Sequence, residues 1–172
     1  SETCLAEFGV AGGGSCVTMA VAAAEGSPGR RCKLYAFDTF DGMPEPSSRD
    51  TLVAGGLEAA ATHWATGTCS GPVEHVTRLA AAFGAEVVPV LGDFRSVAVP
   101  GDMPPILAAH IDCDWFESTE AALRLTWPRL LGGGRSVVQI DDFRYWSGCR
   151  EAVEAFAPAR GVAFRDIDGN AV

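Results

Sequence analysis

The sequence lacks the features of a membrane protein or a nucleic-acid-binding protein. No apolar run is long enough to cross a bilayer, so we expect no membrane partner. Positive charge is scarce, because 13 Lys and Arg residues are outnumbered by 22 Asp and Glu residues, which gives a formal net charge of −9. A basic surface for nucleic acid is therefore not expected. The remaining composition, 48% hydrophobic and 20% charged over 172 residues, is typical of a single globular domain spanning residues 1–172.

The sequence also lacks a C-x-x-C cysteine motif and a G-x-G-x-x-G glycine motif. The 6 cysteines form no C-x-x-C pair, so we interpret them as reduced, small apolar residues of a cytoplasmic protein. The glycine-rich run at residues 9–14 contains no G-x-G-x-x-G, which argues against a nicotinamide dinucleotide ligand. An NAD-dependent oxidoreductase or epimerase on a similar sheet remains an alternative. A non-catalytic remnant that binds a cofactor, or nothing, is a further alternative.

Strand-like and helix-like segments alternate along the chain. We predict strands at residues 5–10, 33–37, 86–91, 106–111, 137–140 and 162–167, and helices at 14–24, 57–64, 72–83, 118–130 and 149–159. Ser70 is expected to cap the helix at 72–83. This alternation predicts an α/β fold with a Rossmann-like, doubly wound, mostly parallel sheet. The Pro- and Gly-rich stretch 41–56 is the expected ligand-covering loop.

Both ends of the sequence indicate a piece of a longer protein. The first predicted strand starts almost at once, near Cys4, and the chain stops just after a turn signal at Asp168-Gly169. We therefore expect truncated ends.

Acidic residues gather where two predicted strands end. Asp112 follows the strand at 106–111, and Asp141 and Asp142 follow the strand at 137–140. In an open α/β sheet this edge binds ligands, and grouped carboxylates repel one another unless a cation joins them. We therefore predict a Mg²⁺ site at these three aspartates. Asp114, two residues further along an assumed extended strand, is expected to support the site rather than bind the ion.

Three other strand ends indicate an adenosine-bearing ligand. Glu7 precedes the turn that starts at Gly9, and a carboxylate there suits a cationic ligand, such as the methionine end of S-adenosylmethionine, better than a pyrophosphate. Asp38 follows the second strand, where a carboxylate can accept both ribose hydroxyls. Asp93 follows the third strand and is placed to meet an adenine edge.

Several of these blocks resemble the macrocin O-methyltransferase family. The resemblance is carried by 7–15, Asp38-Thr39-Phe40-Asp41-Gly42-Met43-Pro44, His110-Ile111-Asp112-Cys113-Asp114 with Ser118-Thr119, Asp141-Asp142-Phe143 and 146–153. Family members are Mg²⁺- and S-adenosylmethionine-dependent enzymes that methylate sugar hydroxyls of secondary metabolites such as antibiotics. Tryptophan and phenylalanine stand at 115–116 where members usually have leucine and tyrosine. The span before Asp141 is also longer than expected, around 134–136.

The resemblance also implies roles for individual residues. Glu7, Gly9, Gly13 and Ser15 would form the methionine part of the cofactor site, Asp38 would hold the ribose, and Asp93 would lie near adenine. Asp112, Asp141 and Asp142 would bind Mg²⁺.

The reaction needs a base, because an alcohol is a poor nucleophile at neutral pH. We predict Asp112 as that base, with His110 as the alternative, although a structural role is favoured for His110. Tyr145 and Trp146 fit either an acceptor wall or the core. The expected partner is a sugar or glycoside acceptor of unspecified identity, and we expect a homo-oligomer.

Overall fold

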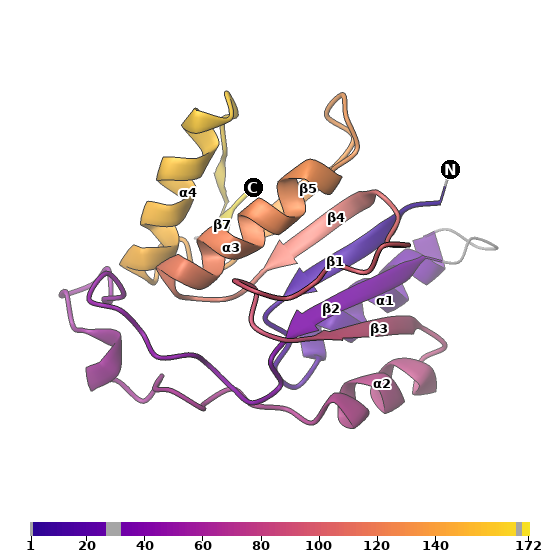
Figure 1. The fold of residues 1–172 in the computed structure, drawn as a ribbon, viewed down its shortest axis with the longest axis horizontal. Coiled ribbons are helices and arrows are strands. Elements are labelled where there is room, and N and C mark those ends of the chain that lie inside the picture. The colour runs from indigo at the N-terminus through magenta and orange to yellow at the C-terminus, as the bar shows by residue number, and fades with distance from the viewer. Residues whose placement is uncertain (1, 27–31, 168–169) are drawn as a thin grey trace.

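The sheet has seven strands in the part of the chain that the computed structural model describes, residues 2–26, 32–167 and 170–172 (Figure 1). Its order is β3-β2-β1-β4-β5-β7-β6. The strands are β1 (Cys4–Phe8), β2 (Lys33–Asp38), β3 (Glu86–Leu91), β4 (Ile106–Ile111), β5 (Val137–Ile140), β6 (Asp166–Ile167) and β7 (Asn170–Ala171). β1 to β5 pair in parallel, and β7 runs antiparallel to both β5 and β6. The prediction of a doubly wound, mostly parallel, Rossmann-like sheet is confirmed.

Helices cover both faces of this sheet (Figure 1). They are α1 (Gly14–Gly26), α2 (Val73–Ala82), α3 (Phe116–Thr126) and α4 (Ser147–Ala159), with single 3₁₀ turns η1 (Ala59–Ala61) and η2 (Trp127–Arg129). α1 and α2 pack on one face, and α3 and α4 pack on the other. The chain reverses strand order beside β1 and β4, and ligands bind at that point in sheets of this kind.

The residues of β1 show how the sequence builds these two layers. Cys4, Ala6 and Phe8 point into the core under α3 and α4, whereas Leu5 points into the core under α1 and α2. This alternation follows from the two-residue period of a strand, and all five residues of β1 are buried because the strand is central.

Most differences from the predicted elements lie at helix ends. Ser70 does not cap α2, which begins at Val73 with Pro72 in the N-cap position. α3 starts at Phe116, two residues early, and gives way to the 3₁₀ turn η2 at Trp127, next to Pro128, whose ring cannot continue an α-helix. The predicted helix at 57–64 is only the turn η1.

The C-terminal strand prediction was only partly right. The predicted strand at 162–167 shrinks to β6, and β7 was missed. The turn predicted at Asp168-Gly169 lies outside the described residues. No described helix combines the length and the apolarity needed to span a membrane.

Candidate functional site

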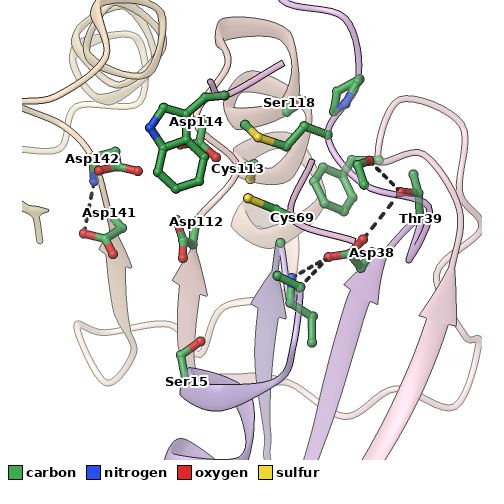
Figure 2. Close-up of a pocket in the computed structure, with 18 of the residues that line it drawn as sticks. Ser15, Asp38, Thr39, Cys69, Asp112, Cys113, Asp114, Ser118, Asp141 and Asp142 are labelled. Carbon is green, nitrogen blue, oxygen red and sulfur yellow. Dashed lines mark hydrogen bonds between the residues drawn. The ribbon is translucent and has the colours of Figure 1, made fainter. Parts of the chain in front are cut away.

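A cavity of about 680 Å³ opens at the carboxyl ends of the parallel strands (Figure 2). The glycine-rich turn after β1 lines one end, and the aspartates after β4 and β5 line the other. The lining also includes Thr39, Met43, Pro44, Trp64, Cys69, Phe94, Ser118, Tyr145 and Trp146. The cavity therefore lies at the sheet edge where the sequence predicts the ligands.

Gly9 joins the two ends of this cavity at the backbone. Its φ is +84°, and a Cβ at this position would lie 1.8 Å from the carbonyl oxygen of Asp112. The Asp112 N–H also donates to the carbonyl oxygen of Phe8 at 2.8 Å. Only glycine fits here, because both the left-handed backbone and the close approach exclude a side chain.

Asp38 braces the glycine-rich turn with its carboxylate. Oδ2 accepts hydrogen bonds from the N–H groups of Val10 at 2.5 Å and Ala11 at 3.0 Å, and Oδ1 accepts one from Phe40 at 2.7 Å. Asp38 also lines the cavity, and its role in ribose binding stays a prediction. Gly9 and Ser15, two other predicted cofactor residues, line the cavity as well.

Two predicted cofactor residues do not reach the cavity wall. Gly13 has a φ of +82° and packs on Val76 of α2, where a Cβ would approach a valine methyl to 2.9 Å. Glu7 is fully buried on β1, beside His110 in the register between β1 and β4. The separation between Glu7 Oε1 and His110 Nδ1 is 2.9 Å. Glu7 therefore lies beneath the site, because strand alternation turns its side chain away from the opening. Gly13 lies at the contact between the glycine-rich turn and α2.

His110 shares this buried position. Burial by itself would lower the pKa of His110, but the hydrogen bond and the charge of Glu7 raise it above its ordinary value. Its Nε2 lies 4.0 Å from Asp141 Oδ2. His110 is not among the cavity-lining residues, which fits the structural role that the sequence favours.

The aspartates after β4 and β5 belong to two overlapping groups of potential metal ligands. Potential ligand atoms of Asp112, Asp114 and Asp142 lie within 4.8 Å of one another, and so do those of Asp112, Asp141 and His110. The pairing of Ile111 with Ile140 aligns the two strand ends, so the longer span before β5 does not displace Asp141. Asp112 belongs to both clusters and is the centre of the group.

Three of these carboxyl groups, those of Asp112, Asp114 and Asp142, have pKa values above the ordinary value of an aspartate. Burial, followed by the charges of Asp141 and Asp142, raises the pKa of Asp112 to about 7. Burial and the neighbouring Asp142 carboxyl raise the pKa of Asp114 well above its usual range. Burial also raises the pKa of Asp142. Burial is the largest cause of each shift, and neighbouring carboxyl groups add to it for Asp112 and Asp114. A divalent ion bound here would favour the ionised forms.

The position of Asp114 differs from the one assumed in the sequence argument. β4 ends at Ile111, and Asp114 has a left-handed backbone with a φ of +58°. Its side chain lines the cavity, and Oδ1 accepts a hydrogen bond from Trp146 Nε1 at 2.8 Å. The assumption of a continuing strand was wrong, and Asp114 joins the carboxylate group directly.

Asp93 lies at the rim and already has a cationic partner. Its carboxylate accepts two hydrogen bonds from Arg95, from Nε at 3.0 Å and from the terminal nitrogen Nη2 at 2.6 Å. The hydrogen bond from the Arg95 side chain lowers the pKa of Asp93 below its usual value. Arg95 also forms an ion pair with Glu117 at 2.7 Å.

Sequence reasoning missed several residues of the cavity wall. Trp64 and Cys69 come from beyond the predicted covering loop, and nothing in their local sequence marks them. Tyr145 is 46% exposed and Trp146 is 1% exposed, and both line the cavity. The two residues therefore combine the packing and wall roles that the sequence left open.

The donor set fits a hard divalent cation. Oxygens of Asp112, Asp114 and Asp142 lie close enough to share one ion, and Mg²⁺ prefers oxygen ligands of this kind. The predicted ligand Asp141 groups instead with Asp112 and His110. In the described part of the chain, no lysine or arginine side chain lines the cavity to neutralise these acids. The chemistry at this end of the cavity therefore favours a bound cation over an internal ion pair.

Comparison with known proteins identifies the family of the chain. The sequence profile of the family Macrocin-O-methyltransferase (TylF) matches residues 2–172. The chain is 33% identical over 174 residues to a Streptomyces olivaceus protein named 8-demethyl-8-(2,3-dimethoxy-alpha-L-rhamnosyl)-tetracenomycin-C 4'-O-methyltransferase. That match covers 98% of this chain and 64% of the relative, so the chain spans a little under two thirds of that protein.

Solved structures share the fold. The O-methyltransferase NovP matches with a TM-score of 0.77 at 20% identity, over 98% of this chain and 70% of NovP. The calicheamicin methyltransferase CalS11 matches with a TM-score of 0.78 at 22% identity, over 98% and 70% of the two chains. Because the family profile covers nearly every residue, the chain belongs to the macrocin O-methyltransferase family.

Proposed function

We propose that this chain forms the core of an S-adenosylmethionine-dependent, Mg²⁺-assisted O-methyltransferase that acts on a sugar hydroxyl of a glycoside. The observation that carries the proposal is the carboxylate group centred on Asp112, which faces a glycine-rich turn across one cavity. Family membership and the name of the Streptomyces relative support the reaction class and a deoxyhexose acceptor such as rhamnose. The predicted homo-oligomer and cytoplasmic location remain predictions.

The glycine-rich end is suited to the methyl donor. Gly9 and Ser15 expose backbone and a hydroxyl to the cavity, and Asp38 Oδ1 has one lone pair left for a ribose hydroxyl beside the three N–H groups that the carboxylate accepts. Asp93 would meet the adenine from the rim. Glu7 would act from beneath by fixing His110 and by adding negative charge under a cationic sulfonium.

The acidic end is suited to the acceptor. Asp112, Asp141 and Asp142 would hold Mg²⁺, which when bound lowers the pKa of an alcohol. These residues would orient the acceptor oxygen towards the methyl group, and orientation supplies much of the rate in such transfers. The fully buried Trp146 holds Asp114 in place through its indole N–H.

We propose Asp112 as the base that accepts the acceptor proton, as the sequence predicts. The position of Asp114 makes it the competing candidate, because its carboxyl lies in the same group and lines the cavity. The two assignments give different results in Asp114→Asn. If Asp112 is the base, this variant keeps at least a tenth of the turnover at saturating Mg²⁺. If Asp114 is the base, turnover at saturating Mg²⁺ falls by about 10²–10⁴-fold.

The charge of the cavity favours a neutral acceptor. Asp38, Asp93, Asp112, Asp114, Asp141 and Asp142 line it, and no lysine or arginine of the described chain does. The nearest rim arginine, Arg95, is already paired with Asp93 and Glu117. A single Mg²⁺ offsets only part of this negative charge, so a diphosphate group would meet repulsion. We therefore propose a glycoside, rather than a nucleoside-diphosphate sugar, as the substrate.

The test is methyl transfer from labelled S-adenosylmethionine to two acceptors that carry the same sugar. We expect 4-nitrophenyl α-L-rhamnoside to be methylated with Mg²⁺ and not in EDTA, and thymidine-diphosphate rhamnose to react at least about tenfold more slowly. Full activity in EDTA would overturn the metal assignment. Preference for the diphosphate sugar would overturn only the neutral acceptor. A protein that binds S-adenosylhomocysteine but methylates neither acceptor would support the non-catalytic alternative.

A further inference from the structure

One segment, residues 44–53, is fastened to both of the loops that carry the acidic group. We call it the strap. The carbonyl oxygen of Pro44 accepts a hydrogen bond from Trp115 Nε1 at 3.0 Å, next to Asp114. At its other end, the Val53 N–H donates to the carbonyl oxygen of Tyr145 at 2.9 Å, close to Asp142. The strap therefore bridges the segment after β4 and the segment after β5.

Asp50 is the buried centre of this strap. Asp50 is only 1% exposed, and both oxygens of its carboxylate accept hydrogen bonds. Oδ1 accepts the N–H of Phe116 at 2.8 Å, and Oδ2 accepts the N–H and the hydroxyl of Ser47 at 2.7 and 2.8 Å. A buried carboxylate is stable only with such partners, so its position is tightly specified.

The first turn of α4 packs directly against the same carboxylate. A Cβ at Gly148 would lie 1.9 Å from Asp50 Oδ1 and 2.8 Å from the Phe116 nitrogen. Phe116 is the first residue of α3, and Gly148 is the second residue of α4. Asp50 thus lies where the positive ends of two helices meet, and both ends favour its negative charge.

The spacing of these two helix starts determines the spacing of the acids. Asp112 and Asp114 lie immediately before α3, and Asp141 and Asp142 lie shortly before α4. Asp114 and Asp142 both have left-handed backbones, with φ values of +58° and +59°, a conformation that persists only when the surroundings impose it. The rings of Trp115 and Trp146, one in each segment, meet at a centroid distance of 4.9 Å.

We infer that Asp50 is a positioning residue for the metal site. By holding the starts of α3 and α4 together, it sets the separation of the carboxylates that bind a divalent cation. Asp50 does not line the cavity, so its expected effect on the cation is indirect. This inference rests on the Mg²⁺ site of the proposed function and adds a residue from a distant part of the sequence to it.

The test compares Mg²⁺ and S-adenosylhomocysteine binding by calorimetry in Asp50→Ala and Asp50→Asn. We expect Asp50→Ala to weaken Mg²⁺ binding by about tenfold or more, in the range found for residues that orient metal ligands, with cofactor-product binding within threefold of wild type. Asp50→Asn should be intermediate, because its amide can still accept from Phe116 but places a second donor against Ser47. Glu45→Ala is the control, since it removes an exposed carboxylate from the same strap.

Gly148→Ala separates position from charge. This substitution removes no carboxylate, but its added methyl group collides with Asp50 and must displace it. It should therefore also weaken Mg²⁺ binding. Folded Asp50→Asn and Gly148→Ala proteins with wild-type Mg²⁺ affinity would overturn the inference. Equal losses of Mg²⁺ and cofactor-product binding would also overturn it, because they indicate general disruption. Absence of Mg²⁺ binding in the wild-type protein would instead overturn the metal site itself, and with it any positioning role.

Discussion

The two ends of the cavity use aspartate in opposite ways. At the glycine-rich end, the Asp38 carboxylate accepts three backbone N–H groups. At the acidic end, Asp112 has other carboxylates as its closest charged neighbours, and its pKa rises to about 7. The same side chain is therefore a structural brace in one place and part of the proposed cation site in the other. Backbone N–H groups satisfy the carboxylate at the first end, whereas the second end is where the proposed Mg²⁺ would bind.

The largest effect on stability is expected at Gly9, because this residue lines the glycine-rich end and contacts the Asp112 backbone at the acidic end. Gly9→Ala should lower the free energy of unfolding by at least about 3 kcal/mol, because it combines a left-handed alanine with a collision against the Asp112 carbonyl. Urea denaturation measures the effect. Gly12→Ala is the matched control, since a Cβ there meets no atom within 4 Å, and it should change stability by less than about 0.5 kcal/mol. Equal stabilities of the two variants would contradict the backbone contact.

Asp38→Ala should weaken cofactor-product binding at the glycine-rich end and leave Mg²⁺ binding at the acidic end nearly unchanged. The N–H groups of Val10, Ala11 and Phe40 lose their acceptor, which costs about 1–3 kcal/mol for buried donors. S-adenosylhomocysteine affinity should fall by about tenfold or more, while Mg²⁺ affinity stays within threefold, as calorimetry can establish. If Mg²⁺ binding fell as much as cofactor-product binding, the two ends would not be independent.

A further prediction concerns the pH dependence of stability. The folded-state pKa of Asp112 is raised to about 7 from 3.8, so the folded protein keeps this proton where the unfolded chain has lost it. The metal-free protein should therefore lose stability as pH rises from about 4 to about 7, by at most about 1.4 kcal/mol per pH unit from this group, and level off above. Urea midpoints in EDTA between pH 5 and 8 test this slope.

Asp112→Asn is the comparison for the pH experiment, because it removes the titrating group while nearly preserving its size. The difference between the wild-type and variant slopes isolates the contribution of Asp112. Saturating Mg²⁺ should also flatten the wild-type slope above pH 6, since the bound ion favours the ionised form. Identical slopes in the wild type and the variant would show that Asp112 is not the source.

The sequence predicted the sheet more completely than the site. The bounds of β3, β4 and β5 agree with the predicted strands, because their apolar runs end at clear polar or glycine residues. The position of Glu7 was also accessible in principle, since Leu5 and Glu7 share one face of β1 and turn away from the face of Phe8. The expectation that Glu7 lines the cofactor cavity relied on its closeness in sequence to Gly9 instead.

Other features depend on contacts that sequence spacing does not reveal. A left-handed aspartate at position 114 is uncommon, and local sequence does not announce it. Asp50 lies in a polar stretch predicted only as a loop, and it becomes buried through partners 66 residues away, at Phe116. Long-range packing therefore decided the parts of the site that local patterns left open.

Cation binding at the acidic end is the central property proposed for this protein. Titration of the metal-free protein with Mg²⁺ by calorimetry should show one site whose affinity strengthens between pH 6 and 8, with protons released on binding, because the carboxylates must ionise. Asp112→Asn should abolish this binding, and Asp102→Asn, an exposed aspartate outside the cavity lining, should leave it unchanged. No binding by the wild-type protein, or equal binding by Asp112→Asn, would contradict the account.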